Sequence, residues 1–202
     1  KRQGSAIRLT IARYYTPTGR CIQKPYDKGL DEYYREESDR FENGELEVQD
    51  SIRVNDSLKF TTPGGKIVYG GGGIVPDVFI PLDTAGRSHY LFEVSNKGLV
   101  NRFCFAYADR NRNDLKNKYK DGEEFNAKFK VDNNLMNELF SYAEKNGVAR
   151  NQQQINVSSA VLSNQVKALI ARNLWGNTGF YPVIHANDWA VNKAVALFSE
   201  KK

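Results

Sequence analysis

The sequence predicts a mixed α/β protein, in which a strand-rich part (residues 1–85) is followed by a helical extension (residues 86–202). Two observations lead to this prediction. Apolar and polar residues alternate with a period of two near the start of the chain, as in a strand with one buried face. From about residue 83 onward, apolar residues recur at spacings of three and four, as on one face of a helix.

The first predicted strand has the strongest alternation. Ile7, Leu9 and Ile11 point to one face, and the residues between them point to the other. Residues 16–19, Thr-Pro-Thr-Gly, then predict a turn, because proline fixes φ at the second turn position and glycine closes it. A buried strand so near the beginning of the sequence predicts that this chain is the later part of a longer protein.

Three further elements complete the predicted strand-rich part. Apolar residues at helical spacing predict a helical insert near residues 28–43, ended by Gly44. Residues 56–69 predict a β-hairpin whose Pro-Gly pair suits a type II turn with Gly64 at positive φ. The glycines at 70–73 predict a sharp chain reversal or a close backbone approach. They do not predict a phosphate loop, since both the Gly-Lys-Ser/Thr motif and the Rossmann spacing are missing.

Apolar stripes divide the helical extension into several predicted helices. Asp132 is a predicted N-cap, as is Ser158 or Ser159 in a later helix. Residues 125–131 are predicted as a short strand or an extended linker. The predicted helical stretches are a short helix from Tyr90, then residues 99–119, 132–147, 157–174 and 187–198.

The stripes between residues 99 and 198 are predicted to pack mainly against one another. Leu169 is the predicted core marker, and Lys167 is predicted on the solvated face of the same helix. Trp175, Tyr181 and Trp189 are interpreted as packing anchors in preference to an aromatic ligand site, because they lie at helix ends and on apolar faces.

Two sequence blocks resemble the C-terminal processing, or tail-specific, serine peptidases. Residues 4–20, Gly-Ser-Ala-Ile-Arg-Leu-Thr-Ile-Ala-Arg-Tyr-Tyr-Thr-Pro-Thr-Gly-Arg, look like the strand and turn that follow the catalytic lysine in that family. Residues 71–81, Gly-Gly-Gly-Ile-Val-Pro-Asp-Val-Phe-Ile-Pro, look like its Gly-Ile-x-Pro-Asp strand, and their prolines confine that strand to an edge or to strand ends. The blocks stand in the family's order, and the insert and helical tail resemble the versions found in Bacteroidetes-type bacteria.

The resemblance implies that the parent protein is a periplasmic or cell-envelope serine endopeptidase with a Ser-Lys dyad. In such a dyad a neutral lysine takes the proton of a serine that forms an acyl-enzyme. The family's serine lies in an upstream small-residue motif and its lysine in a Phe-Gly-Lys-Gly-type motif, and this sequence contains neither. Lys1 stands only three positions before Gly4, so we interpret it as a charged residue at a strand entrance. We therefore predict no catalytic residue in this chain.

The same resemblance implies the partners. They are a protein or peptide substrate and the upstream PDZ and catalytic segments of the parent chain, where a lipid anchor could also be attached. Association with a second copy of the chain stays open. The alternative function is a non-catalytic peptide-binding or assembly module with a peptidase-like fold.

Other catalytic constellations are less well supported by the sequence. Ser88 or Ser5, with His89 or His185, could be combined with a carboxylate into a triad, but no Gly-x-Ser-x-Gly elbow is present. The carboxylate pairs at residues 36–37 and 123–124 are adjacent in sequence, so they are not expected to converge on one side of an element.

Composition argues against several classes of function. The net charge of +5 is spread over mixed charges without a long basic run, which argues against nucleic-acid binding. No apolar run approaches the roughly 20 residues of a membrane span. Cys21 and Cys104 are interpreted as free thiols, with a disulfide left open, and no zinc-ligand pattern or cofactor motif is present. Arg8, Arg13 and Arg20 could contact a peptide carboxylate, although salt bridges are the preferred interpretation.

Overall fold

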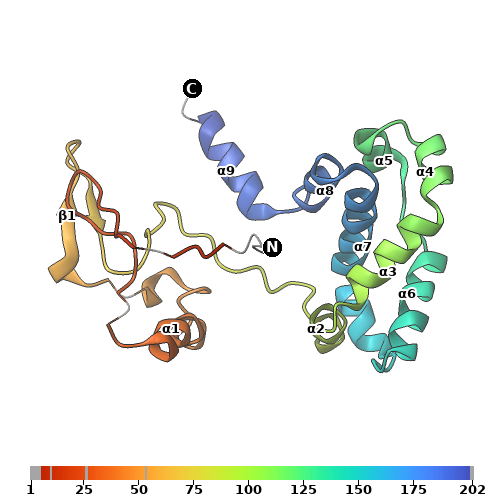
Figure 1. Ribbon diagram of the computed structural model, residues 1–202, viewed down its shortest axis with the longest axis horizontal. Helices are drawn as coiled ribbons and strands as arrows, with labels where there is room; N and C mark the ends of the chain where they lie inside the picture. The colour runs from red at the N-terminus through yellow and green to blue at the C-terminus, as the bar shows by residue number, and fades with distance from the viewer. Residues whose placement is uncertain (1–5, 10, 26, 53, 201–202) are drawn as a thin grey trace, which may run out of the picture. The chain divides into compact units, whose positions relative to one another are not determined.

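The computed structural model describes residues 6–9, 11–25, 27–52 and 54–200. Contacts divide the chain into two compact units, Lys1–Asp83 and Thr84–Lys202 (Figure 1). Every buried apolar side chain among the described residues belongs to the second unit. The two units therefore have to be explained by different physical principles.

The first unit contains little regular structure in its described part. Its helix α1 spans Leu30–Glu42, and strands β1 (Lys59–Thr61) and β2 (Ile67–Tyr69) form an antiparallel pair. Short 3-10 turns occupy Gln49–Ser51 and Asp56–Leu58. A two-stranded sheet is marginally stable by itself, and no described side chain of this unit is buried.

The prediction of a mixed α/β fold with a strand-rich peptidase core is wrong for this structure. The described residues among 6–14 form no strand, and the only pairing nearby is an isolated bridge between Tyr15 and Cys21. Ile7, Leu9 and Ile11 are 86%, 75% and 93% exposed. A strand needs a neighbour for its backbone hydrogen bonds and a layer to cover its apolar face, and the described residues supply neither.

The second sequence block also forms no strand. Residues 74–82 are irregular, with Ile74, Val75 and Val78 each more than 40% exposed. The Gly73 N–H donates to the Ile22 carbonyl at 2.9 Å, so the glycine run lies against the chain that follows the first turn. A Cβ on Gly71 would meet the flexible side chain of Leu58, so the close backbone approach predicted for the glycine run is shown by the Gly73–Ile22 hydrogen bond and not by Gly71.

The turns and the helical insert of the first unit are closer to prediction. The Gly19 N–H donates to the Thr16 carbonyl at 2.8 Å, which confirms the first turn. The helical insert is confirmed as α1, and Gly44 follows it with φ of 74°. In the β1–β2 hairpin, Gly65 and not Gly64 has positive φ. The type II prediction is therefore wrong, and the glycine with positive φ instead follows the Pro-Gly pair.

All regular secondary structure in the described part of the second unit is helical. No described helix combines the length and apolar character that crossing a lipid bilayer requires. The helices are α2 (His89–Asn96), α3 (Leu99–Arg110), α4 (Arg112–Lys118), α5 (Gly122–Lys128), α6 (Asn133–Lys145), α7 (Gln152–Trp175), α8 (Asn177–Ile184) and α9 (Trp189–Glu200).

Side-chain caps set the start of four of these helices. The caps are Ser88 for α2, Asp121 for α5, Asp132 for α6 and Asn151 for α7. Each side-chain oxygen accepts a hydrogen bond from the backbone N–H three residues later, at distances between 2.9 and 3.1 Å. These bonds satisfy N–H groups that have no partner within the helix. The prediction of Asp132 as a cap is confirmed.

Several helix predictions in the second unit need correction. The predicted stretch 99–119 is two helices, α3 and α4, separated at Asn111. Residues 125–128 belong to α5, which begins after the Asp121 cap, and only residues 129–131 form the predicted extended linker. α7 begins at Gln152, so Ser158 lies inside the helix and donates its hydroxyl proton to the Gln154 carbonyl at 2.9 Å. α8 lies between the predicted helical stretches 157–174 and 187–198 and was not predicted.

The core of the second unit is built on α7, which packs against α2, α3, α5 and α8 (Figure 1). Its residues Leu162, Val166 and Ile170 have no exposed surface. Leu169, the predicted core marker, is only partly buried at the edge of this core. Lys167 is not simply solvated either, because its Nζ donates to the Asn126 carbonyl at 2.6 Å.

Aromatic packing joins α5 to the end of α7. The Phe125 ring stacks on Phe129 with a centroid distance of 4.3 Å and lies 5.1 Å from the Trp175 ring. Trp175 is thus a packing anchor, as predicted. In contrast, no side chain of α9 is buried and Phe198 is 79% exposed. The prediction that all stripes up to Phe198 pack together is therefore wrong for this last helix.

Small residues let three helices touch through their backbones. A Cβ on Gly122 of α5 would lie 2.8 Å from the Cα of Gly179 in α8. A Cβ on Gly179 would lie 2.8 Å from the carbonyl oxygen of Ala171 in α7. Backbone atoms cannot give way as a flexible side chain can, so glycine is required at both positions for this packing.

We expect Leu162→Ala to lower the free energy of unfolding of the second unit by about 2–5 kcal/mol, because it removes a buried side chain and leaves a cavity. The matched control is Val157→Ala on the same helix, whose side chain is 58% exposed and whose truncation should change stability by less than about 0.5 kcal/mol. Urea unfolding followed by circular dichroism measures both. Equal losses in the two variants would contradict the packing of α7.

Candidate functional site

The serines and histidines considered for a triad serve structural roles where they are described. Ser88 caps α2 and shares a hydrogen bond with the Ser158 hydroxyl at 3.0 Å. The Nδ1 atom of His89 lies 3.6 Å from a Glu93 carboxylate oxygen, and its side chain is 70% exposed. His185 follows the end of α8. Ser5 and Lys1 lie outside the described residues. The described candidates do not form a nucleophile–base pair.

His185 has two partners close by in the sequence. Its ring stacks on Tyr181 with a centroid distance of 5.3 Å, and its Nδ1 atom lies 3.4 Å from Asp188 Oδ2. Asp188 also accepts hydrogen bonds from the backbone N–H groups of Ala190 and Val191, which lower the pKa of its carboxyl group together with the contact to His185. Tyr181 and His185 therefore help to form the junction between α8 and α9.

The predicted carboxylate pairs do not converge on a site. Glu36 forms an ion pair with Lys24, while the side chain of Glu37 lies outside the described part of the chain. Glu124 accepts hydrogen bonds from Lys128 Nζ at 2.6 Å and from the backbone N–H of Lys120 at 2.8 Å, and these bonds lower the pKa of its carboxyl group. Its neighbour Glu123 is exposed.

The arginines of the first block are in different surroundings. Arg8 and Arg13 are exposed, whereas Arg20 is half-buried and donates from Nη1 to the Tyr69 carbonyl at 3.4 Å. The buried Nε of Arg20 has no hydrogen-bond partner among the described residues. The structure therefore provides no common carboxylate-binding group made of these three side chains.

Thiol and metal chemistry find little support in the described residues. Cys21 is half-buried in the first unit, Cys104 is fully buried in the second, and both are free thiols. No group of three or more potential metal ligands comes together within the described part of the chain.

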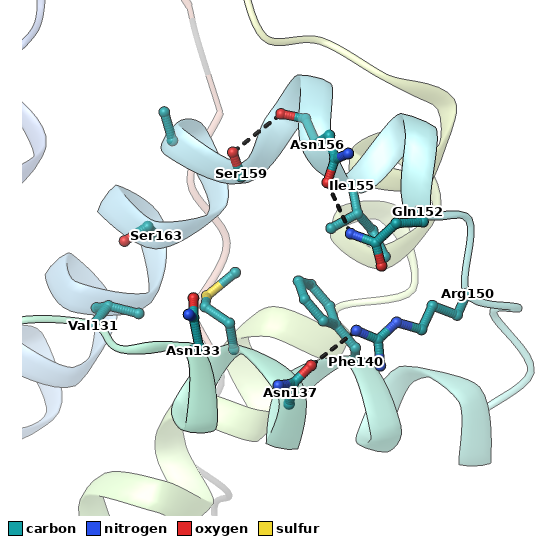
Figure 2. Close-up of a pocket in the computed structure, with 12 residues that line it drawn as sticks. Val131, Asn133, Asn137, Phe140, Arg150, Gln152, Ile155, Asn156, Ser159 and Ser163 are labelled. Carbon is teal, nitrogen blue, oxygen red and sulfur yellow. Dashed lines mark hydrogen bonds between the residues drawn. The ribbon is translucent and has the colours of Figure 1, made fainter.

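A groove between α6 and the first half of α7 is the candidate site (Figure 2). It encloses ≈ 540 Å³ and is lined by twelve residues, all between Val131 and Ser163. Both helices pack against α3. The buried side chains of Met136, Phe140 and Ile155 contribute the apolar surface.

Neutral polar side chains form most of the rest of the groove. Asn133 and Asn137 lie one turn apart on α6, as do Gln152 and Asn156 on α7. Gln152 Nε2 donates to Asn156 Oδ1 at 2.8 Å. Figure 2 also shows the Ser159 hydroxyl, which donates to the backbone carbonyl of Asn156 at 3.1 Å. The walls thus present both hydrogen-bond donors and acceptors.

Arg150 is the charged member of the twelve lining residues. It lies just before the Asn151 cap of α7, and its Nη2 atom donates to Asn137 Oδ1 of α6 at 2.8 Å. Its guanidinium carbon is 5.2 Å from the centre of the Phe140 ring, in a cation–π arrangement. These two contacts orient the guanidinium at the end of the groove where α6 and α7 are connected (Figure 2).

Sequence reasoning missed this groove. The i, i+4 pairing of Asn133 with Asn137 and of Gln152 with Asn156 was visible in the sequence, but polar residues at helical spacing usually mark a solvated face. Only the separation of α6 from α7 turns the two polar faces into the walls of one groove. Two smaller hollows, ≈ 330 Å³ beside Tyr107 and ≈ 220 Å³ beside Lys24, have mixed charges and fewer lining residues.

Two buried ionisable side chains support the fold near this groove. Burial raises the pKa of the Cys104 thiol to about 12. Burial, aided by the charge of Glu144 and opposed by that of Arg150, raises the pKa of the Tyr90 phenol to about 12. The Tyr90 hydroxyl is buried without a hydrogen-bond partner among the described residues, so both groups are held in their neutral forms.

We expect the second unit to lose stability in alkali. In the unfolded chain a thiol and a phenol release their protons near pH 8.5 and 10, whereas in the folded chain both keep them until about pH 12. The stabilisation is complete below about pH 8.5 and is lost as the pH rises toward 12. Urea unfolding at pH 8 and pH 10.5 measures the loss. The double variant Cys104→Ala/Tyr90→Phe, which removes both titrating groups, should show a smaller loss, and an unchanged pH dependence in that variant would contradict the account.

Comparison with known proteins gives one match. Residues 90–176 match DUF8443, described as a family of unknown function. This region contains the whole groove and helices α3 to α7. No curated protein and no solved structure matches the chain.

Proposed function

We propose that this chain is a non-catalytic C-terminal portion of a serine endopeptidase, and that it associates with the catalytic segments of its parent protein. The proposal rests on the resemblance of residues 4–20 and 71–81 to the C-terminal processing peptidases. One structural observation supports it. The first unit exposes apolar residues along both blocks and has no buried side chain among its described residues.

The apolar residues that alternate in the sequence are exposed in the structure. Ile7, Leu9 and Ile11, which would share one face of a strand, are at least 75% exposed. Burying an aliphatic side chain of this size contributes about 1.5–3 kcal/mol. Three such residues would therefore strongly favour binding to an apolar protein surface. The resemblance implies that the catalytic segments of the parent protein provide that surface.

In the proposed parent enzyme, the chemistry belongs to segments upstream of this chain. A lysine kept neutral by burial would accept the proton of the serine hydroxyl, and the serine oxygen would attack the peptide carbonyl to give an acyl-enzyme. Protein substrates, an upstream PDZ segment and a periplasmic or envelope location belong to the same proposal. The present chain would contribute binding and assembly.

A peptide-binding module without an associated enzyme is the second candidate function. The groove between α6 and α7 favours it, since its volume lies within the range of about 300–1,000 Å³ that is usual for ligand sites. The upstream sequence of the parent separates the two functions. A small-residue serine motif and a Phe-Gly-Lys motif there would favour the enzyme.

We expect the purified chain to be inactive as a peptidase. It should neither cleave casein nor react with a serine-directed fluorophosphonate, because its described serines lack an adjacent base. Gel-based labelling, with trypsin as the positive control, is the measurement. Specific labelling of any serine of this chain would overturn the proposal that the chain is non-catalytic.

We expect the purified chain to self-associate, because the uncovered apolar segment is available to pair with another copy when its proposed partner is absent. The triple variant Ile7→Thr/Leu9→Thr/Ile11→Thr should shift the population toward monomer in multi-angle light scattering. The control Val157→Thr, an exposed position on α7, should not. A monodisperse wild-type monomer would contradict the idea that this segment needs a partner.

A further inference from the structure

We propose that the groove between α6 and α7 binds the C-terminal end of an extended polypeptide, with the terminal carboxylate on the guanidinium of Arg150. This inference is independent of the serine endopeptidase proposal, because every lining residue belongs to the helical unit 84–202. The inference assigns a class of ligand to the groove, which lies in the region that matches DUF8443, a family of unknown function.

The shape of the groove suits a chain end. Residues 146–151 connect α6 to α7 at one end of the groove, and Arg150 and Gln152 lie at that end (Figure 2). Val131 and Ser163 lie at the opposite end (Figure 2). A polypeptide that enters between Val131 and Ser163 therefore runs toward the connection and reaches Arg150 there.

The charges at the connected end favour a carboxylate. The twelve lining residues include Arg150 and no acidic residue. A guanidinium has five N–H donors, of which the bond to Asn137 uses one, and it forms no ion pair with a described carboxylate. The N-terminus of the 24-residue helix α7 lies at the same end, and its dipole adds to the attraction for an anion.

The walls suit a peptide backbone. Each residue of an extended peptide offers one N–H donor and one carbonyl acceptor, and an Asn or Gln side chain can bind both. Asn133 and Asn137 on one wall face Gln152 and Asn156 on the other (Figure 2). The hydrogen bond between Gln152 and Asn156 holds these two amides in the unliganded protein and can be exchanged for bonds to a peptide.

The dimensions set the length of the bound segment. Asn133 and Phe140 are seven residues apart on α6, which corresponds to about 10 Å along the helix axis. An extended chain advances about 3.3 Å per residue. The groove therefore accommodates about three residues that end in a free carboxylate.

Fluorescence anisotropy with two peptide libraries tests this inference on the full chain. Both libraries are fluorescein-labelled pentapeptides whose last three positions are mixtures of Ala, Ser, Val and Leu. One library ends in a free carboxylate and the other in a carboxamide. We expect saturable binding of the free-acid library and binding at least about tenfold weaker for the carboxamide library, because charge-assisted hydrogen bonds to the terminus are lost.

Variants locate the binding. Arg150→Gln should weaken binding of the free-acid library at least about tenfold, and Arg150→Lys should fall between, since it keeps the charge but loses the planar fork. Lys116→Gln on α4 makes the same charge change at an exposed residue outside the groove and should bind like the wild type. Thermal melts by circular dichroism confirm that each variant is folded.

Several outcomes would overturn the inference. Equal affinity for the acid and carboxamide libraries would exclude recognition of the terminus. Wild-type binding by Arg150→Gln would place the peptide elsewhere. If the free-acid library does not bind at 1 mM protein, the groove is not a peptide site. The same conclusion follows if fluorescein-labelled chitotriose, an oligosaccharide, binds in place of the peptides and its binding depends on Arg150. None of these results bears on the peptidase proposal, which is tested by serine labelling and light scattering.

Discussion

The packing of α7 is the constraint on which the second unit depends. Leu162, Val166 and Ile170 form a fully buried stripe along this helix, and α2, α3, α5 and α8 are all packed against it. At one end, the backbone contacts at Gly179 and Ala171 leave no room for a Cβ. At the other end α7 separates from α6, although both helices rest on α3. The groove exists because α3 holds two helices that do not close on each other.

The first unit lacks such an organising element in its described part. Hydrogen bonds hold its turns and its short hairpin, but no described apolar side chain is fully buried. Local hydrogen bonds each contribute only about 0.5–1.5 kcal/mol, which does not offset the conformational entropy lost on ordering the chain. A segment with exposed apolar side chains is stabilised when it packs against another protein surface. We therefore propose that it has a role in assembly.

The sequence was most informative where structure is determined locally. Asp132 was predicted as a cap and Gly44 as the residue following a helix, because each needs only its immediate neighbours. The strand predicted through Ile7 and Leu9 failed, since alternation marks a face that can be buried and says nothing about whether a partner is present. α5 was missed because its Asp121 cap was overlooked and its apolar residues are aromatic, which fit a strand equally well. The groove could not be predicted, because it depends on the angle between two helices and not on either helix alone.

Hydrogen exchange followed by mass spectrometry on the full chain tests the central claim, that the second unit folds around α7 while the first depends on another body. In the isolated chain, diluted below the concentration at which it self-associates, we predict slow exchange with full cooperative protection for the amides of α3 and α7. The amides of residues 6–14 and 74–82 should exchange within seconds at pH 7, because so few of them are hydrogen-bonded in the described structure. Protection of residues 6–14 equal to that of α7, in a sample shown to be monomeric, would contradict the account.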